Sequence, residues 1–351
     1  MRVYFMEMAE NEEFEQRKDK HIHINLSEDV QSSLGTGLDR IHLVHNALPE
    51  IALAEVDPSS TFFSRKLNYP VLISSMTGGT QRASEINQIL AEVAQEFGFA
   101  MGVGSQRISL ENPETSYSFN VRKTAPDILL FANLGAVQLN YGYSLEHCQR
   151  AMDAIEADAL ILHLNPLQEA LMDNGDTDFS GLLKKIEAVC NSLQKPVVVK
   201  EVGWGISALT AKRLVGAGVS AIDVAGAGGT SWSQVEKFRS KNPIQKMIAD
   251  DFRSWGIGTV DALVEIRSIF PEIMLIASGG LKNGVDIIKC IALGASLGGL
   301  ARPFLISADK SLVETRVFAQ KITGQIKVAM FAAGARTLSE LKEEKIHKRV
   351  Y

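Results

Sequence analysis

Short hydrophobic runs alternate with amphipathic stretches along the chain from about residue 70 onward. Eight runs of five or six residues have the composition of buried strands, at residues 71–75, 99–103, 128–132, 159–164, 196–201, 221–225, 273–277 and 296–300. Between them, apolar side chains recur at helical spacing in residues 83–97, 144–156, 179–193, 208–216, 260–269 and 284–293. Strands that alternate with helices are typical of a parallel sheet built from βα units.

The number of these units favours a closed barrel. Eight strands within about 230 residues match the size of a (β/α)8 TIM barrel. A doubly wound sheet is the alternative, but its GxGxxG fingerprint is incomplete, because Arg107 stands where a third glycine should follow Gly102 and Gly104. We therefore expect one domain over residues 1–351. Within it, residues 71–351 would form the barrel and C-terminal helices, and residues 1–70 an extension that covers the barrel.

Residues 232–255 form an insertion after the sixth predicted strand. This segment carries the basic residues Lys237, Arg239, Lys241 and Lys246. Its length and charge suit a mobile lid or a subunit contact, and a plain solvated loop fits equally well.

The composition limits the kinds of binding partner and the cellular compartment that we expect. The formal net charge of −5 gives no general attraction to nucleic acid or to an anionic membrane. No apolar run approaches the roughly 20 residues that span a bilayer, and the N-terminus turns acidic too early for a signal peptide. Cys148, Cys190 and Cys290 are far apart and form neither a disulfide framework nor a zinc motif. We expect a cytoplasmic protein in a reducing compartment.

Polar residues follow every predicted strand, and the active site of a barrel of this kind lies at those strand ends. The fourth strand ends in His163, Asn165, Gln168 and Glu169. Strand alternation places His163 and Asn165 on the inward face, where buried polar groups need partners. The other polar strand ends lie at residues 74–79, 104–107, 133–135, 200–201, 226–232, 278–280 and 301–302. Together they predict one ligand-lined mouth.

The last two strand ends are rich in glycine. Gly279 and Gly280 precede a predicted helix, and Gly298 and Gly299 lie in the eighth strand just before Arg302. Glycine lets backbone N–H groups approach an anion, and a helix N-terminus adds partial positive charge. The alternative is that these glycines only make tight turns. Because both loops stand at the usual phosphate position of a barrel, we predict a phosphate site there.

Three further features suit charged ligands. Lys200 ends the fifth strand and could stabilise negative charge on a flavin ring or form a Schiff base; the sequence leaves both roles open. Arg17 and Lys18, with Arg107, could clamp a diphosphate, although a solvated basic turn is the alternative. Glu169 is the natural carboxylate for Mg²⁺, which binds few protein ligands and bridges phosphate oxygens.

At these positions the chain resembles the type 2 isopentenyl-diphosphate isomerases, which are FMN-dependent (β/α)8 enzymes. The most specific matches are the Arg-Lys-x-x-His segment that ends at His21 and the His-x-Asn-x-x-Gln-Glu segment that ends at Glu169. The remaining matches follow in the family's order at residues 75–79, 104–107, 133–135, 200–203, 228–232 and 278–280. The resemblance therefore covers nearly the whole chain.

The resemblance implies a role for each matching residue. FMN would be contacted by Ser75, Met76, Thr77, Gly78, Ser105, Asn133, Lys200 and Thr230, and its phosphate by Gly279, Gly280, Leu281, Ala301 and Arg302. The isoprenoid diphosphate would be bound by Arg17, Lys18, His21, Ser105, Gln106, Arg107 and Gln168, with Mg²⁺ on Glu169.

The implied reaction is a 1,3-allylic proton shift between isopentenyl and dimethylallyl diphosphate in isoprenoid biosynthesis. Reduced FMN would act as the acid/base, NAD(P)H would be the reductant, and the chain would form a homotetramer or homo-octamer. We expect His163, Asn165 and Gln168 to position the substrate and shape the proton path, and Trp232 to wall its apolar tail.

An FMN oxidoreductase of the 2-hydroxy-acid oxidase or inosinate dehydrogenase type is the alternative, because it shares the phosphate segment. Hydroxy-acid oxidases place a histidine base near the seventh strand, and this chain has no histidine between His163 and His347. The nucleotide dehydrogenases need a nucleophilic cysteine in a glycine-rich loop, and residues 226–231 contain none. A non-catalytic barrel would leave Arg17, Lys18 and Glu169 without a purpose.

Overall fold

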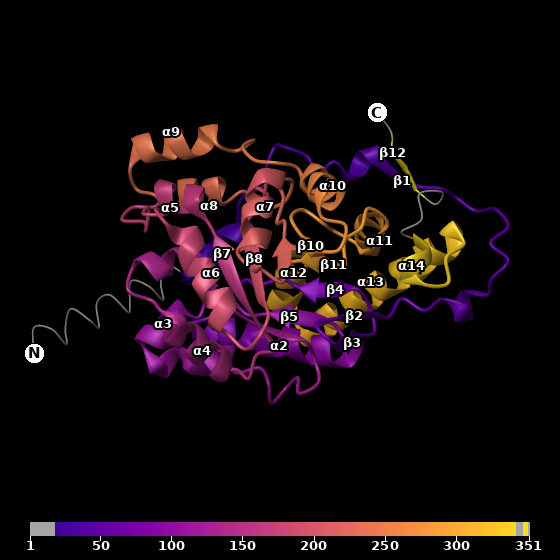
Figure 1. Cartoon of the computed structure of the whole chain (residues 1–351), viewed down its shortest axis with the longest axis horizontal. Helices are drawn as coiled ribbons and strands as arrows, with labels where there is room; N and C mark the ends of the chain where they lie inside the picture. The colour runs from indigo at the N-terminus through magenta and orange to yellow at the C-terminus, as the bar shows by residue number, and fades with distance from the viewer. Residues whose placement is uncertain (1–17, 342–346, 350–351) are drawn as a thin grey trace, which may run out of the picture.

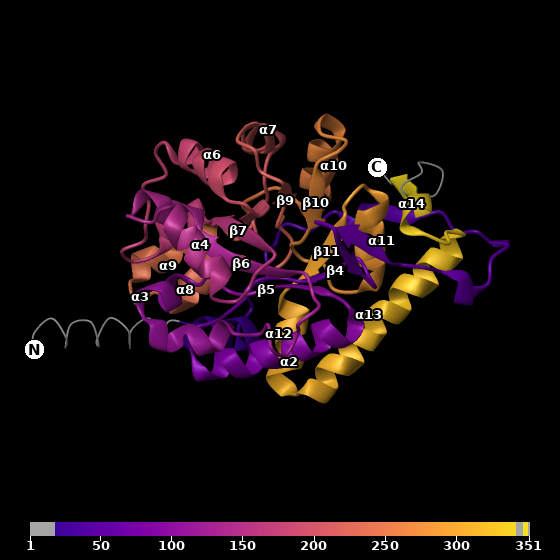
Figure 2. The same ribbon diagram turned by 60° about the horizontal axis from the view of Figure 1, so that its bottom comes forward.

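The computed structural model describes residues 18–341 and 347–349. Eight parallel strands close into a barrel, with β11 paired to β4, and helices surround it (Figures 1 and 2). In chain order the barrel strands are β4 (Val71–Ile73), β5 (Ala100–Gly102), β6 (Leu130–Gly135), β7 (Ala159–Leu164), β8 (Val197–Glu201), β9 (Ala221–Asp223), β10 (Met274–Ala277) and β11 (Leu297–Leu300). The predicted (β/α)8 barrel is confirmed.

The helices between the strands begin and end where local chemistry dictates. The Thr80 hydroxyl accepts the Ala83 amide at the start of α2, and Gly98 ends that helix in the left-handed conformation. The helices are α2 (Gln81–Phe97), α3 (Arg107–Glu111), α4 (Leu145–Asp153), α5 (Pro166–Leu171), α6 (Leu182–Ser192), α7 (Ala208–Gly216), α8 (Trp232–Arg239), α9 (Pro243–Asp251), α10 (Thr259–Ile269), α11 (Gly284–Ala292), α12 (Arg302–Lys310), α13 (Leu312–Ala333) and α14 (Leu338–Leu341). Short 3₁₀ turns are η1 (Leu38–Arg40), η2 (Leu53–Glu55), η3 (Pro113–Phe119) and η4 (Ala136–Asn140).

The third barrel strand corrects one predicted boundary. We expected it at residues 128–132, where the apolar run ends, but β6 continues to Gly135. Asn133 lies within this strand, paired in register with Ile161 of β7. The predicted strand ended too early because Asn133, a polar residue that faces the barrel interior, interrupts the apolar run.

The barrel interior changes from apolar to polar along its axis. Inward-facing residues nearer the strand starts form one buried cluster, which contains Leu72, Ala100, Phe131, Ala159, Ile161, Val198, Ala221, Ile276 and Leu297. Phe62 and Leu67 belong to the same cluster and come from the hairpin of β2 (Ser60–Phe62) and β3 (Arg65–Leu67). The hairpin thus closes the end of the barrel where the strands begin. At the other end, inward positions carry polar side chains.

The first described segment of the N-terminal extension lies at the opposite, open end, where Lys18, His21, Ile22 and Asn25 line the cavity mouth. Residues 18–27 are helical, and Ile22, Ile24 and Asn25 within them are buried. Gln31 forms a backbone bridge with Thr230 in the loop after β9. Further along, β1 (Ile41–Leu43) pairs antiparallel with β12 (His347–Arg349) beside α11 and α14 (Figure 1).

The insertion is helical, so the solvated-loop alternative is wrong. It folds into α8 and α9, and α8 buries Ser233, Gln234, Val235 and Glu236. Three of these four residues are polar. Hydrophobic spacing in the sequence therefore could not identify the buried face of α8. The buried Gln234 side chain donates its Nε2 to the Ala249 carbonyl of α9 at 3.3 Å.

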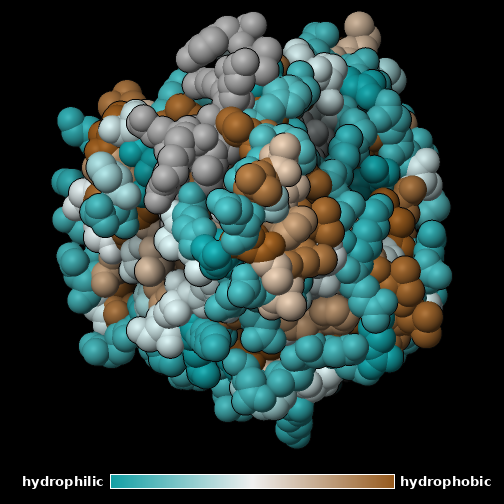
Figure 3. Space-filling model, turned by 90° about the vertical axis from the view of Figure 1, so that its right-hand side faces the viewer, coloured by the Kyte–Doolittle hydropathy of each residue, from teal (hydrophilic) through white to brown (hydrophobic). Residues whose placement is uncertain are grey.

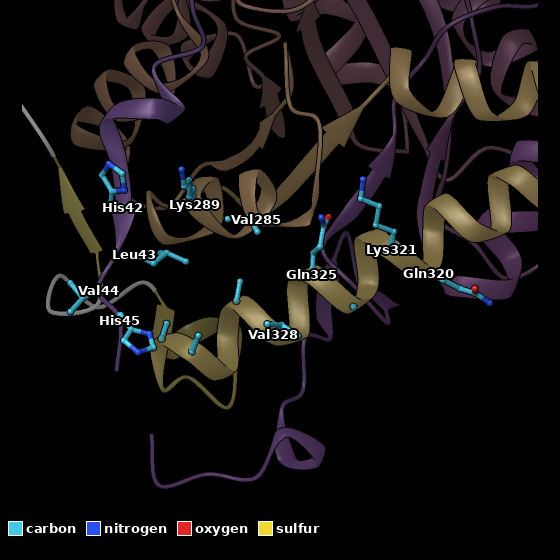
Figure 4. A pocket seen from close by; sticks show the side chains of 14 residues that line it. His42, Leu43, Val44, His45, Val285, Lys289, Gln320, Lys321, Gln325 and Val328 are labelled. Atoms are coloured by element: carbon cyan, nitrogen blue, oxygen red, sulfur yellow. The ribbon is translucent and has the colours of Figure 1, made fainter. Parts of the chain in front are cut away.

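The outer surface carries an apolar groove of about 650 Å³ between α11, α13 and residues 42–45 (Figure 4). Val285, Val328 and Ala332 contribute to its apolar wall. Figure 3 faces this side of the molecule and shows hydrophobic side chains gathered near its centre. In the part of the chain that is described, no helix has the length and hydrophobicity to cross a membrane.

Phe62 tests the closure of the barrel floor. Its ring is fully buried and packs edge-on against Phe131, with ring centroids 6.3 Å apart. Phe62→Ala should lower the free energy of unfolding by about 3–5 kcal/mol, because it leaves a cavity that the surrounding strands cannot fill. Urea unfolding measures the loss. The matched control, Leu48→Ala at an exposed site, should change it by less than about 0.5 kcal/mol, and an equal effect of the two would contradict this role.

Candidate active site

A cavity of about 600 Å³ opens at the carboxyl ends of the barrel strands. Residues that follow all eight strands line it, together with Lys18, His21, Ile22 and Asn25 of the N-terminal helix. The eight polar strand ends predicted from sequence therefore meet in one mouth.

Polar side chains from neighbouring strands form the floor of this cavity and the layer directly beneath it. His163 and Lys200 pair in register on β7 and β8, and Lys200 pairs with Asp223 on β9. The Lys200 ammonium lies 3.8 Å from the Asp223 carboxylate, which accepts the Ser278 hydroxyl at 2.6 Å. Asn133 of β6 adds a hydrogen bond to His163, 2.9 Å from Oδ1 to Nδ1.

The His163 imidazole is neutral. Burial, helped by the positive charges of Lys18 and Lys200, lowers its pKa to about 3. Asn133 donates its Nδ2 to the Val103 carbonyl, so its Oδ1 faces the imidazole as an acceptor. The neutral ring therefore carries its proton on Nδ1, and Nε2 is left as an acceptor.

Gln168 is held by a carboxylate from the insertion. Its Nε2 donates to Glu236 of α8 at 3.1 Å, and Glu236 also accepts Arg239 at 2.6 Å and lies 3.6 Å from His21. Burial alone would raise the pKa of Glu236, but His21, Arg239 and Gln168 lower it to about 2. One ionised carboxylate thus joins the N-terminal helix, α5 and the insertion. The His21 ring also packs edge-on against Trp232, at 5.2 Å between centroids.

A second carboxylate, Asp176, organises the neighbouring part of the same wall. Asp176 accepts Arg107 at 2.6 Å and Gln138 at 2.9 Å. Its backbone amide donates to Glu169 at 2.8 Å, and Asn165 donates to the other Glu169 oxygen at 2.7 Å. These hydrogen bonds fix the orientation of the Glu169 carboxylate, and carboxylate oxygens are the ligands that a hard cation prefers. Among the described residues, no cluster of three or more His, Cys, Asp or Glu side chains could hold a metal by itself.

The other side of the cavity fits a flavin phosphate and ring. The amides of Gly280 and Leu281 have no acceptor within the described residues. The buried hydroxyls of Ser74, Ser75 and Thr77 likewise lack a partner there. Buried polar groups in native proteins are nearly always paired, so these groups await a polar ligand. The remaining predicted FMN contacts that line the cavity are Met76, Ser105, Asn133, Lys200, Thr230, Gly279, Ala301 and Arg302.

Gly280 requires glycine for a backbone reason. Its φ is +79°, and a Cβ there would lie 2.4 Å from the Thr36 methyl group and 2.5 Å from the backbone of Gly228. The tight-turn explanation is therefore correct for this glycine, and its predicted contact with a phosphate stays a prediction.

Two predicted site residues lie outside the cavity lining, and a third is not among the described residues. Gln106 is fully buried outside the cavity, where it donates to the Ala151 carbonyl and accepts the Asn133 amide, so its assignment to substrate binding is corrected to a structural role. Gly78 is also outside the lining, and a Cβ on it would stand 1.9 Å from the Phe119 ring. Arg17 lies outside the described residues.

Sequence reasoning missed Asp176, Asp223 and Glu236. Asp176 and Glu236 lie in a loop and in the insertion, where no strand periodicity places them. Asp223 could have been found, because a carboxylate two residues after Ala221 in an apolar strand must face inward.

This fold and site define an FMN-binding (β/α)8 barrel. The sequence model of the FMN-dependent dehydrogenase family matches residues 146–348. A structure of mandelate oxidase with (S)-2-phenylpropionate has a TM-score of 0.67 at 18% identity, covering 97% of this chain and 98% of that chain. A mandelate oxidase variant with a monooxide FMN adduct gives 0.63 at 19%, covering 94% and 91%. At such identities the likeness shows the fold alone.

Curated relatives specify the family within this class. The isopentenyl-diphosphate delta-isomerase of Nostoc sp. is 50% identical over 335 residues, covering 95% of this chain and 96% of its own. That of Rickettsia canadensis is 49% identical over 340 residues, covering 97% and 99%. The chain belongs to the isopentenyl-diphosphate delta-isomerase family.

The neutral state of His163 predicts a pH dependence of stability. A histidine in the unfolded chain has a pKa near 6.5, whereas His163 in the fold has a pKa of about 3. The unfolded state binds more protons between these values, so the contribution of His163 is complete above about pH 6.5 and is lost as the pH falls toward 3. Between about pH 7 and pH 4, urea unfolding should show the original protein losing stability relative to His163→Gln. A constant difference would contradict the neutral assignment.

Proposed function

We propose that this cavity interconverts isopentenyl and dimethylallyl diphosphate by a 1,3-allylic proton shift. The observation that carries the proposal is the pairing of two unlike walls. Arg107 and Glu169 stand on one wall with Asn165 and Gln168, and the unpaired amides and hydroxyls suited to FMN stand on the other. The names of the relatives support the same reaction.

The proton transfer would use a group of the bound cofactor, and the protein would mainly bind and orient that cofactor. Reduced FMN, when bound, supplies an acid/base group at N5. Ser75, Thr77 and Thr230 would hydrogen-bond the cofactor, and Gly280 with Leu281 would receive its phosphate. Lys200 ends a strand on the cavity floor, where its ammonium stabilises negative charge on the ring.

The substrate diphosphate would bind on the cationic wall. Arg107 gives forked hydrogen bonds and Lys18 a point charge, while Ser105 and His21 lie beside them in the lining. Glu169 would bind Mg²⁺, which bridges phosphate oxygens with few protein ligands. Arg17 precedes Lys18 in the chain and is proposed as a further cation for the same group.

The apolar end of the substrate would lie over the floor. Trp232 walls it, while Asn165 and Gln168 orient it from the loop after β7. Because His163 is neutral and offers Nε2 as an acceptor, it shapes the proton path without placing a second positive charge beside a cation-like transition state.

Several finer assignments belong to the same proposal. NAD(P)H would reduce the flavin. The three free thiols suit a reducing cytoplasm. A homotetramer or homo-octamer would cover apolar surface such as Ile244, Met247 and Trp255, which are exposed on and beside α9.

The oxidoreductase alternative has less support. Its histidine base would stand after the seventh barrel strand, β10, where the lining consists of residues 278–282 and contains no histidine.

An isotope experiment tests the reaction itself. The yellow protein is reduced without oxygen and supplied with isopentenyl diphosphate and Mg²⁺ in D₂O. We expect dimethylallyl diphosphate that carries deuterium, because the shift exchanges a proton with the site. The oxidised protein is the control and should give no product. A colourless protein, or reduced protein that forms no product, would overturn the proposed function.

Gln168→Ala tests the positioning role of the loop after β7. We expect kcat to fall about 100-fold, since misplacing the substrate removes orientation rather than chemistry, and FMN affinity to stay within about twofold. Steady-state kinetics and flavin titration measure the two quantities. Gln149→Ala, exposed on α4, is the matched control and should change neither. An unchanged rate in Gln168→Ala would sink this role.

A further inference from the structure

Asp223 is a buried carboxylate that the proposed reaction does not use. It lies on β9 at the inward position beside Lys200, is 0% exposed, and is not part of the cavity surface. It is therefore too deep to touch a ligand, yet it stands next to the cation that would face the flavin.

The two oxygens of Asp223 have different surroundings. Oδ1 accepts the Ser278 hydroxyl at 2.6 Å and the Ala225 amide at 3.2 Å. Oδ2 has no hydrogen-bond donor among the described residues, and the Lys200 ammonium lies 3.8 Å from it. This distance is an ion pair rather than a hydrogen bond. The ammonium instead donates to the Glu201 carbonyl at 2.7 Å.

The charges of Lys200 and Asp223 together determine how strongly the cavity floor attracts an anion. An isolated charge in a protein interior is costly, so the nearby Lys200 ammonium favours the ionised form of Asp223. Burial raises the pKa of Asp223 and Lys200 opposes that rise. While the pair is ionised, the net charge on the floor is close to zero although a lysine faces the cavity.

We propose that Asp223 is a positioning residue for the flavin site, which acts as the buried counter-ion of Lys200 and limits the positive charge that the cavity floor presents to bound FMN. Reduced flavin carries a negative charge when its N1 is deprotonated, and oxidised flavin does not. Asp223 therefore lowers the preference of the site for the reduced, anionic cofactor. The inference rests on the proposed flavin site.

A structural role for Asp223 is the alternative that the test must separate. The amide it accepts belongs to Ala225, whose φ of +37° is unusual for a residue other than glycine. Asp223 could thus serve only to shape the turn after β9. Such a role would not depend on Lys200.

The experiment is a double-mutant cycle with FMN binding as its readout. Dissociation constants for oxidised and for chemically reduced FMN are measured in the unaltered protein, Asp223→Asn, Lys200→Met and the double variant. In Asp223→Asn the ammonium loses its counter-ion, so reduced FMN should gain about tenfold in affinity relative to oxidised FMN. For the two-electron couple this is an upward shift of about 30 mV. With Lys200→Met present, the same substitution should change the ratio by less than about threefold.

Each outcome decides between the two roles. An unchanged ratio in Asp223→Asn, or an equal change with and without Lys200, would overturn the inference. If Asp223→Asn fails to fold while the double variant folds, an unpaired buried cation is the cause, which supports the pairing; failure of both to fold would overturn it. An unaltered protein that binds no FMN would instead defeat the proposed function.

Discussion

The alternation of side chains along strands in a closed barrel is the constraint on which the site depends. Every second residue of each strand must face an interior that eight strands share, so polar residues at one level meet there whatever their separation in sequence. Asn133, His163, Lys200 and Asp223 come from four successive strands and form that level. The apolar levels beneath them exclude water, and this makes each hydrogen bond and ion pair of the floor stronger than it would be at a surface.

The sequence was sufficient for the barrel and for most of the mouth. All eight strands carry enough apolar residues to be recognised, and the segment from His163 to Glu169 shows its polar face by simple alternation. The sequence was insufficient where the buried side chains are polar. The buried face of α8 contains Gln234 and Glu236, which make hydrogen bonds to α9 and α5 that no local pattern encodes. The side chain of Gln106 points away from the cavity for the same reason, because its partners are backbone groups of distant elements.

Carboxylates in and behind the cavity wall organise much of what faces the ligand. Glu236 holds Gln168 and His21, Asp176 holds Arg107, and Asp223 stands beside Lys200. These acidic groups fix long, flexible side chains in advance, which spares the entropy of ordering them when a ligand arrives. They also explain how a cavity that must attract an anionic substrate can hold several cations close together in the absence of that substrate.

The β2–β3 hairpin leaves the cavity with one entrance among the described residues. Phe62 and Leu67 fill the end where the strands begin, and in the described residues the large cavity opens at the other end, beneath the helix of residues 18–27. Two molecules that share such a dead-ended chamber must enter in order of depth, and the deeper one can leave only after the shallower one. A cofactor seated on the polar floor would therefore exchange slowly during turnover, while a substrate above it comes and goes.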